Sequence, residues 1–421
     1  MSQAPRQLGF ATCVALVVGN IVGGGIFLLP SSLAPLGFNS VIAWGLSSCG
    51  ALLLAYVFSI LARAMPAAGG PYAYTHAAFG PLTAFLVVWG YWISIWVANA
   101  AIATAATSYV STLVPEVFAI RGVPTLFTLA LVWFFTLVNW WGITAVGRVQ
   151  TVTTVLKLLP LIGIALIGFF HTTRAGVAAA GQIPVTFSGT TAACALTFYA
   201  LLGFESATVP DAKVKDPART IPRATLLGTI VTTLLYTLSA TAVILLVPPG
   251  ALGQSNAPFA DAARVLWGNA GSVFVTVCAA VSCIGCLNGW TLLQGELPAT
   301  LARNGVFPRA FAQLSARSTP TFALVVTSIL VSLLVLLTSS DSKSLVSVFT
   351  FMTLLSTTAC VVMYGACAAA MLRLIWIGRL GPLAPRRWWS LVVIGVLAVL
   401  FSLGITVGAD SEPVLWGAAL M

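Results

Sequence analysis

Two glycine-containing segments have the clearest chemical consequence in this sequence. GNIVGGGIF at residues 19–27 and GFES at residues 203–206 each interrupt a long apolar run. Successive glycines make a regular helix less favourable by roughly 1 kcal/mol each, although glycines also allow two helices to pack closely. Where a helix unwinds, amide N–H groups are freed on one side and carbonyls on the other. These groups can hold a carboxylate and an ammonium without any charged side chain.

Three ionisable side chains lie inside apolar runs, namely Lys157, Glu205 and Glu296. A charge at membrane depth is costly, so each of them is a candidate for a functional or a paired role. For Glu296 we favour a pair with Arg303 or another nearby base. Lys157 stands about 10 Å from the start of its run, so its ammonium could also extend along the run to reach the interface. Glu205 follows the second glycine segment and could simply cap freed N–H groups.

The composition requires a membrane environment for these groups. Of 421 residues, 59% are hydrophobic and only 7% are charged, whereas a soluble domain has roughly 25% charged residues. Backbone polar groups inside lipid must be satisfied within the chain, and apolar runs of about 20 residues select helices. Eight cysteines fall in these runs, which argues against a disulfide framework. We interpret the CxxC formed by Cys283 and Cys286 as helix packing, because no histidine or second cysteine pair accompanies it.

Eleven apolar runs are predicted to span the membrane, with a twelfth span left open. We expect the whole chain, 1–421, to form one transmembrane domain. The remaining nine residues after Glu412 are too few to cross a bilayer. The predicted spans are 8–30, 41–62, 83–113, 124–145, 151–170, 190–209, 225–247, 270–300, 320–338, 346–372 and 389–408.

The basic residues predict the orientation. If the N-terminus is cytoplasmic, fourteen lysines and arginines fall in inner segments and four in outer ones, as the positive-inside rule requires. We therefore expect a multi-pass protein of the cell inner membrane. The net charge of +10 is explained by topology, so it calls for no nucleic-acid partner.

The two glycine segments lie in corresponding places. One is in the first span and the other in the sixth, five spans later and in the opposite orientation. Matching interruptions in two inverted halves indicate a transporter binding site near the bilayer midplane. A ligand with both a carboxylate and an ammonium, such as an amino acid, suits such a site.

Five motifs resemble one family over nearly the whole chain. They are GNIVGGGIFLLP, PAAGGPYAYTHAAFGP at 66–81, GFESA at 203–207, KDPARTIPRA at 215–224 and LARNGVFP at 301–308. Together they are similar to the amino acid, polyamine and organocation permease superfamily, and most of all to its bacterial basic amino acid and polyamine antiporters of the arginine/agmatine exchanger type. The resemblance implies an all-α, five-plus-five inverted-repeat bundle like the leucine transporter. The repeats would be 8–170 and 190–372, with 373–421 peripheral.

The resemblance also implies a substrate site. The unwound part of the first helix would bind the α-carboxylate and α-amino groups, and the pocket would be completed from the third, sixth and eighth spans. Tyr199 stands where the arginine exchanger has a tryptophan over the guanidinium, and a cation over a tyrosine face is held more weakly. The residues implied are Asn20, Ile21, Gly23, Gly24, Gly25, Tyr91, Ser94, Asn99, Tyr199, Leu202 and Trp290. Trp89 and Trp92 lie on the same third span. For these two residues, packing or a place in an interfacial belt is as good an interpretation as a place in the substrate pocket.

Two residues are implied in coupling and gating. Lys157, in VLKLLP, resembles the lysine of superfamily members that do not use sodium, where the ammonium replaces the sodium ion and touches carbonyls of the first helix. Glu205 resembles a proton-sensitive gate between the first and sixth spans. Sodium-independent transport is the resulting expectation.

The leading functional hypothesis is a secondary transporter that exchanges or imports a cationic amino acid or its decarboxylated amine. Ile95 and Tyr199 supply no charge recognition, so a proton-coupled importer of neutral amino acids is the alternative. No GxxxxGK[ST] or GxSxG occurs, and the acids at membrane depth lack a histidine, so we expect neither an ATP-driven pump nor an enzyme, and no cofactor or metal. A homodimer is compatible with this architecture, and the absence of a twelfth span would affect dimer contacts or stability.

Overall fold

The fold is taken from a computed structural model of residues 1–421. It describes residues 9–65, 70–141, 143–172, 174–205, 216–315, 319–339, 343–381 and 384–421. Every regular element in these ranges is a helix. The α-helices are α1 Phe10–Ile21, α2 Gly24–Leu33, α3 Phe38–Ala64, α4 Pro71–Phe79, α5 Pro81–Ser111, α6 Pro115–Phe118, α7 Val123–Trp140, α8 Ile143–Gly168, α9 Arg174–Gly181, α10 Phe187–Ala200, α11 Pro217–Leu246, α12 Pro249–Leu252, α13 Pro258–Arg303, α14 Thr321–Thr338, α15 Leu345–Trp376, α16 Pro385–Gly408 and α17 Ser411–Leu420.

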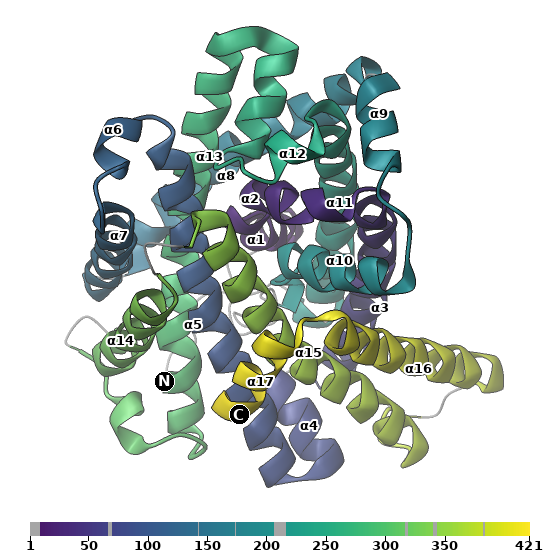
Figure 1. The fold of residues 1–421 in the computed structure, drawn as a ribbon. Helices are drawn as coiled ribbons and strands as arrows, with labels where there is room; N and C mark the ends of the chain where they lie inside the picture. Colours follow the sequence, from purple (N-terminus) through teal and green to yellow (C-terminus); the bar gives the residue numbers. More distant parts are fainter. Residues whose placement is uncertain are drawn as a thin grey trace.

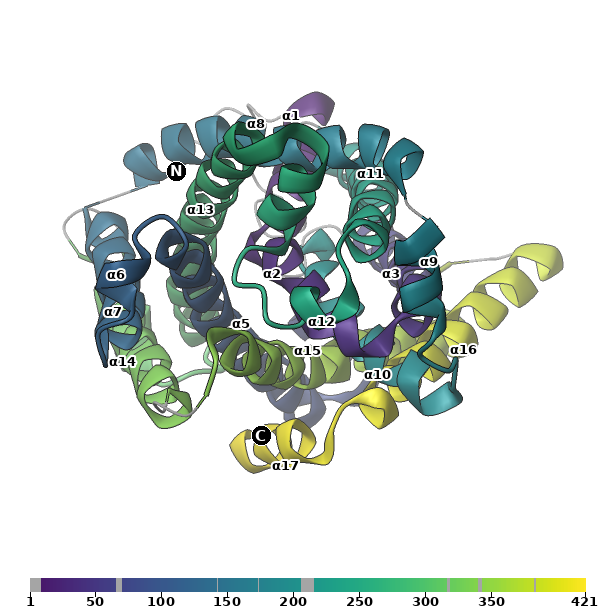
Figure 2. The ribbon, with the colours of Figure 1, turned by 45° about the horizontal axis from the view of Figure 1, so that its top comes forward.

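The long helices form a bundle around the first two (Figure 1). Viewed from one end, α2 lies inside a ring made by α5, α13, α8, α11, α3, α10 and α15, and α1 reaches it from the edge between α8 and α11 (Figure 2). Contacts of α1 with α11 and α13, and of α2 with α5, α13 and α10, confirm that central position. Nearly every residue of α2 is buried, so it sits in protein and not in lipid. The broken segment is therefore shielded on all sides, which is the condition for irregular backbone at membrane depth.

Three helices lie further out. α7 and α14 pack together on one side of α5 and α13, and α16 packs on α15, α10 and α3. Their outward faces carry large exposed apolar side chains such as Leu126, Leu337 and Leu403, as expected for lipid contact. The short α17 returns to lie against α15.

Eight helices in the described ranges are long and apolar enough to cross a membrane. They are Phe38–Ala64, Pro81–Ser111, Val123–Trp140, Arg219–Leu246, Pro258–Arg303, Thr321–Thr338, Leu345–Trp376 and Pro385–Gly408. They correspond to eight of the eleven predicted spans, so the chain is an all-helical integral membrane protein. The other three are the first span, which is divided into α1 and α2, the fifth, in α8, and the sixth, in α10. The total of eleven and the inverted repeat stay predictions.

The first span is interrupted where the glycines predict, but over a shorter stretch. α1 ends at Ile21, Val22 and Gly23 are extended, and α2 starts at Gly24. Only two residues are unwound. Gly24 and Gly25 are helical because packing on neighbouring side chains outweighs their poor helix propensity.

The helix of the sixth span ends just before the predicted interruption. The sequence predicts the break at GFES, residues 203–206, and α10 ends at Ala200. Leu201 and Leu202 close the last turn with bonds to the carbonyls of Phe198 and Tyr199. Gly203 then has a φ of 108°, which only glycine adopts readily, and this turns the chain out of the helix. Residues 206–215, including Ser206, lie outside the described ranges.

The eighth span lies within α13. This element runs from Pro258 to Arg303, but the backbone is not helical at Gly268, where φ is 68° and ψ is −162°, so two helices meet there. Pro258 begins the helix because its missing N–H would have had no partner in the first turn. The straight part after the bend matches the predicted span 270–300 and carries Cys283, Cys286 and Trp290.

Candidate functional site

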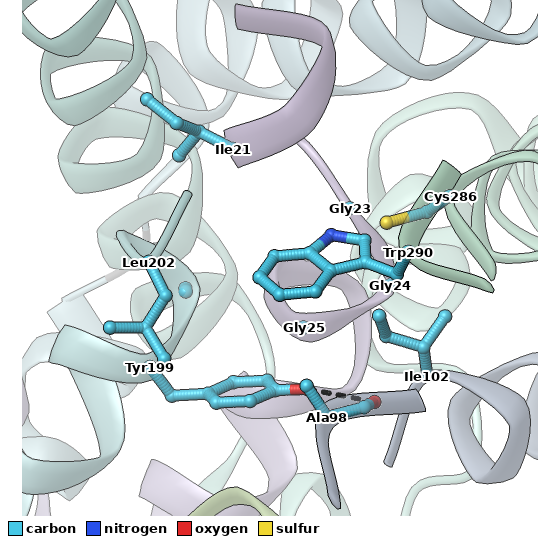
Figure 3. Close-up of a pocket in the computed structure, with 11 residues that line it drawn as sticks. Ile21, Gly23, Gly24, Gly25, Ala98, Ile102, Tyr199, Leu202, Cys286 and Trp290 are labelled. Atoms are coloured by element: carbon cyan, nitrogen blue, oxygen red, sulfur yellow. Dashed lines mark hydrogen bonds between the residues drawn. The ribbon is translucent and has the colours of Figure 1, made fainter. Parts of the chain in front are cut away.

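A small cavity lies where the break between α1 and α2 meets the end of α10 (Figure 3). None of the eleven described residues that line it carries a charge. Seven of them are residues that the sequence predicted, namely Ile21, Gly23, Gly24, Gly25, Tyr199, Leu202 and Trp290. The other four are Ala98, Ile102, Ala200 and Cys286. An ion in this cavity would have to be held by backbone dipoles, aromatic faces and neutral polar groups.

Two of the lining glycines are needed for close approach. A Cβ built at Gly23 would lie 2.4 Å from the Sγ of Cys286, and one at Gly25 would lie 2.8 Å from the ring of Tyr199. Both distances are far below van der Waals contact. At Gly24 the nearest atoms belong to Ile102 and Cys283, at 3.2 and 3.3 Å. The glycine run therefore brings the backbone of the break directly against α13 and α10.

The start of α2 presents backbone N–H groups to the cavity. Gly24 and Gly25 form its first turn, and the first four N–H groups of a helix have no partner within that helix. With the aligned peptide dipoles they favour a negatively charged group. This end of the cavity can accept a carboxylate.

The end of α1 is held by two side chains. Lys157 is fully buried and its Nζ donates to the carbonyl of Gly19 at 2.5 Å. Tyr236 donates its hydroxyl to the carbonyl of Ile21 at 3.0 Å. A cation at a helix C-terminus is favoured by the dipole. This burial contradicts the alternative that Lys157 extends to the membrane interface.

Lys157 also lies within electrostatic range of the eighth span. Its ammonium lies in the neighbourhood of the thiols of Cys283 and Cys286 of α13. It thus joins α8, the end of α1 and α13 beside the break. This is the arrangement that the family resemblance implied, with a fixed cation next to the carbonyls of the first helix.

Glu205 does more than cap the end of α10. It is 1% exposed and accepts hydrogen bonds from the Tyr91 hydroxyl at 2.9 Å, the Tyr364 hydroxyl at 2.5 Å and the Gly203 N–H at 3.1 Å. The two tyrosines belong to α5 and α15. Glu205 therefore ties the break after α10 to two helices of the surrounding ring, and Tyr364 also stacks on Phe204 with ring centroids 4.9 Å apart.

Three predicted pocket residues are buried near the cavity without lining it. Tyr91 is turned to Glu205, and Ser94 donates to the Tyr91 carbonyl of its own helix at 2.7 Å. Asn99 donates to the carbonyl of Trp290 at 3.2 Å and to Gln294 at 2.7 Å. The side chain of Asn20, a fourth predicted residue, is outside what the structure describes.

Aromatic side chains form two walls of the cavity. Trp290 presents its indole to the cavity, and Tyr199 crosses below it and donates to the carbonyl of Ala98 at 3.4 Å (Figure 3). Both rings offer a face to a cation. Trp89 and Trp92 instead stack among Phe85, Phe307 and Phe311, so the packing alternative holds for them.

Sequence reasoning missed several residues of the site. Cys286 is one helical turn before Trp290, and this spacing could have placed it on the same face. Ile102 is likewise three residues after Asn99, which the sequence did predict. Tyr364 could not have been found, because it lies 159 residues from Glu205 with no local pattern linking them. The expected pair of Glu296 with Arg303 is present at 3.9 Å.

Cysteine and acidic side chains give no metal centre in the described part of the chain, where no cluster of three or more possible ligands occurs. Cys283 and Cys286 pack against Gly24 and Gly23.

Known proteins share this sequence pattern. A family model described as amino acid permease matches residues 8–419. A cadaverine/lysine antiporter of Escherichia coli is 34% identical over 81% of this chain and 77% of its own length. A putative arginine/ornithine antiporter of Bacillus subtilis is 31% identical over 77% of this chain and 76% of its own. A putrescine transporter of Haemophilus influenzae is 27% identical over 99% of this chain and 95% of its own length.

These matches confirm the superfamily resemblance, because the model covers nearly the whole chain and includes both interruptions and every residue of the cavity. The chain belongs to the amino acid permease family, and it is a membrane transporter and not an enzyme.

Proposed function

We propose that the protein is a sodium-independent exchanger of cationic amino acids and their decarboxylated amines. The observation that carries this proposal is the cavity between the ends of α1, α2 and α10, which has helix N–H groups at one side and aromatic faces at the other. The relatives that are antiporters of lysine and cadaverine, or of arginine and ornithine by their names, support the substrate class.

The amino acid end of the substrate would lie at the break. Its carboxylate would meet the N–H groups of Gly24 and Gly25, while its side-chain ammonium would face Trp290 and Tyr199. A cation over an aromatic face gains about 0.5 to 2 kcal/mol. A decarboxylated amine would keep the second contact and leave the first to water, so one cavity serves both members of an exchange pair.

Lys157 replaces a coupling ion in this proposal. Its ammonium occupies the carbonyl end of α1, bonded to Gly19, where a sodium ion would otherwise be needed to stabilise the break. Movement of α1 and α2 requires this bond to break. Loss of the proton from Lys157 would weaken it, so proton movement can be linked to opening.

Alternating access would move α1, α2, α3, α10 and α11 against a scaffold that includes α5, α7, α13 and α14. The bonds that cross between the two groups would have to break, and they include Tyr91 to Glu205, Tyr199 to the Ala98 carbonyl and Tyr109 to the Phe27 carbonyl. Among the residues that make these bonds, Glu205 is the one whose charge changes when it takes up a proton. We therefore propose that Glu205 acts as the gate. Protonation would remove the charge that both tyrosine hydroxyls now solvate.

We further propose an inner-membrane location with a cytoplasmic N-terminus, on the fourteen-to-four distribution of basic residues. The alternative of a neutral amino acid importer is supported by the uncharged lining of the cavity. This alternative and the proposed exchanger differ in the substrates that they transport. A neutral amino acid importer would transport leucine and alanine and would not transport diamines.

The test is counterflow into proteoliposomes of purified protein. Vesicles are loaded with unlabelled compound and exposed to radiolabelled lysine, arginine, ornithine, cadaverine, putrescine, agmatine, leucine or alanine, in sodium and in choline buffers. We expect saturable exchange of at least one amino acid with an amine, at equal rates in both buffers. Exchange confined to leucine and alanine would support the alternative, and a strict need for sodium would contradict the role of Lys157.

A further inference from the structure

A line of buried hydrogen bonds runs from the cavity wall into the scaffold. Asn99 of α5 donates from Nδ2 to the carbonyl of Trp290 at 3.2 Å and to the Oε1 of Gln294 at 2.7 Å. Gln294 of α13 donates from Nε2 to Ser328 of α14 at 2.9 Å, and Ser328 contacts the hydroxyl of Thr136 of α7 at 2.6 Å. All four polar side chains are buried. Four helices are thus joined through Gln294.

The direction of each bond is determined by backbone carbonyls at the two ends. Thr136 donates its proton to the carbonyl of Val132 at 2.8 Å, so Ser328 must be the donor in the bond between the two hydroxyls. Ser328 can then accept only from an N–H, which turns the Nε2 of Gln294 toward it and the Oε1 toward Asn99. At the other end the Trp290 carbonyl accepts only from an N–H. Asn99 therefore has one amide orientation.

This orientation leaves one acceptor unused. Both N–H groups of Asn99 are engaged, while its Oδ1 is buried and has no hydrogen-bond partner among the described residues. A buried acceptor without a partner is costly, so its retention calls for a reason. Asn99 does not line the cavity itself but lies next to residues that do, namely Ala98 and Ile102 of the same helix and Trp290, to which Asn99 is bonded.

We propose that Gln294 is a positioning residue which keeps the Oδ1 of Asn99 available for the ammonium group of the substrate. The inference rests on the proposed function and adds the source of its charge selectivity. An ammonium is a donor only, so it can bind Asn99 through Oδ1 but is repelled by its N–H groups. Because no acid is among the described residues that line the cavity, a neutral oxygen held in one orientation supplies the directional contact that the aromatic faces lack.

The test compares two ligands that differ only in the side-chain ammonium. Lysine and norleucine are used as competitors of exchange in proteoliposomes, and the ratio of their inhibition constants is measured. Gln294→Met keeps the length of the side chain but removes its acceptor and donor. Asn99 is then free to turn, so we expect the preference for lysine to fall about tenfold, the loss of one charge-assisted hydrogen bond. Because it is a ratio, the readout does not depend on how much protein is active.

The matched control is Thr327→Val on α14. Thr327 lies beside the main chain of Gln294, at 3.4 Å from its carbonyl, but it takes no part in the chain of side-chain bonds. We expect its lysine-to-norleucine ratio to equal that of the unmodified protein. An equal fall in both variants would mean that packing alone is responsible and would overturn the inference.

Two further variants keep the proposal testable if Gln294→Met does not fold. Ser328→Ala removes the bond that turns the Gln294 amide, and we expect a fall of about threefold in the same ratio. In a background of Asn99→Ala, which removes the acceptor, replacing Ser328 should have no further effect on the ratio. Additive effects, or no fall with Ser328→Ala, would overturn the role of Gln294. If the unmodified protein exchanges no cationic substrate, the proposed function itself fails.

Discussion

Gly23→Ala is the substitution for which the structure gives the sharpest expectation. The new Cβ would lie 2.4 Å from the Sγ of Cys286, whereas carbon and sulfur atoms in contact are about 3.6 Å apart. Either the Cys286 side chain must change its rotamer, or the break and α13 must separate by about 1.2 Å. Overpacking of this kind costs about 1 to 3 kcal/mol. If that cost falls on the conformation that holds substrate, exchange decreases about 5- to 150-fold.

A second substitution isolates the cause. In Cys286→Ala the sulfur is gone and the nearest remaining atom of residue 286 is its Cβ, which would lie 3.6 Å from a methyl group introduced at position 23, an ordinary contact. Gly23→Ala combined with Cys286→Ala should therefore recover at least half of the lost activation free energy, although each single variant is slower than the unmodified protein. Gly45→Ala on α3 is the control, because nothing lies within 4 Å of its Cβ.

The assay is the initial rate of exchange in proteoliposomes, normalised to the amount of protein that elutes as a folded species. Thermal unfolding of each variant in detergent separates lost stability from lost transport. A Gly23→Ala protein that exchanges at the normal rate would refute the close approach of the break to α13. A double variant no faster than Gly23→Ala would refute the assignment of the clash to Cys286.

Three other predictions concern coupling, gating and selectivity. Lys157→Met should lower the rate of exchange at least about tenfold, because the Gly19 carbonyl loses a charged donor. Sodium should not restore the rate, and an unchanged rate in choline buffer would contradict the prediction. Glu205→Gln should flatten the dependence of exchange on pH, since the gate loses its protonatable group, and a pH profile parallel to that of the unmodified protein would show that another group titrates. Tyr199→Trp should lower the KM for arginine or agmatine about two- to tenfold relative to lysine, as measured by concentration series, because tryptophan is the stronger cation platform.

Much of the site could be predicted from the sequence because its determinants are local. Three successive glycines can hardly be explained except by an interruption of the helix or by a close approach of another element. Both occur here: the helix is interrupted at Gly23, and a side chain at Gly23 or Gly25 would collide with a neighbouring helix. A lysine within an apolar run must find a partner, and Lys157 does so at Gly19. The paired interruptions, five spans apart, predicted where the cavity would lie.

The remaining features depend on contacts between distant segments. Gly24 and Gly25 are helical against their propensity because α2 is packed on α13 and α10. The end of α10 at Ala200, three residues before the first glycine of GFES, is likewise decided by packing. Tyr364 and Gln294 reach their partners across more than 150 residues, so only the folded chain reveals that they belong to the site.

The most direct test of the proposed transport site is a structure of the protein with the amine or amino acid that it exchanges fastest. We predict density for that compound between the first turn of α2, at Gly24 and Gly25, and the indole of Trp290, with its ammonium within hydrogen-bond distance of the Asn99 Oδ1. Substrate bound elsewhere, or an empty cavity at saturating concentration, would contradict the claim that the interrupted helices form the transport site.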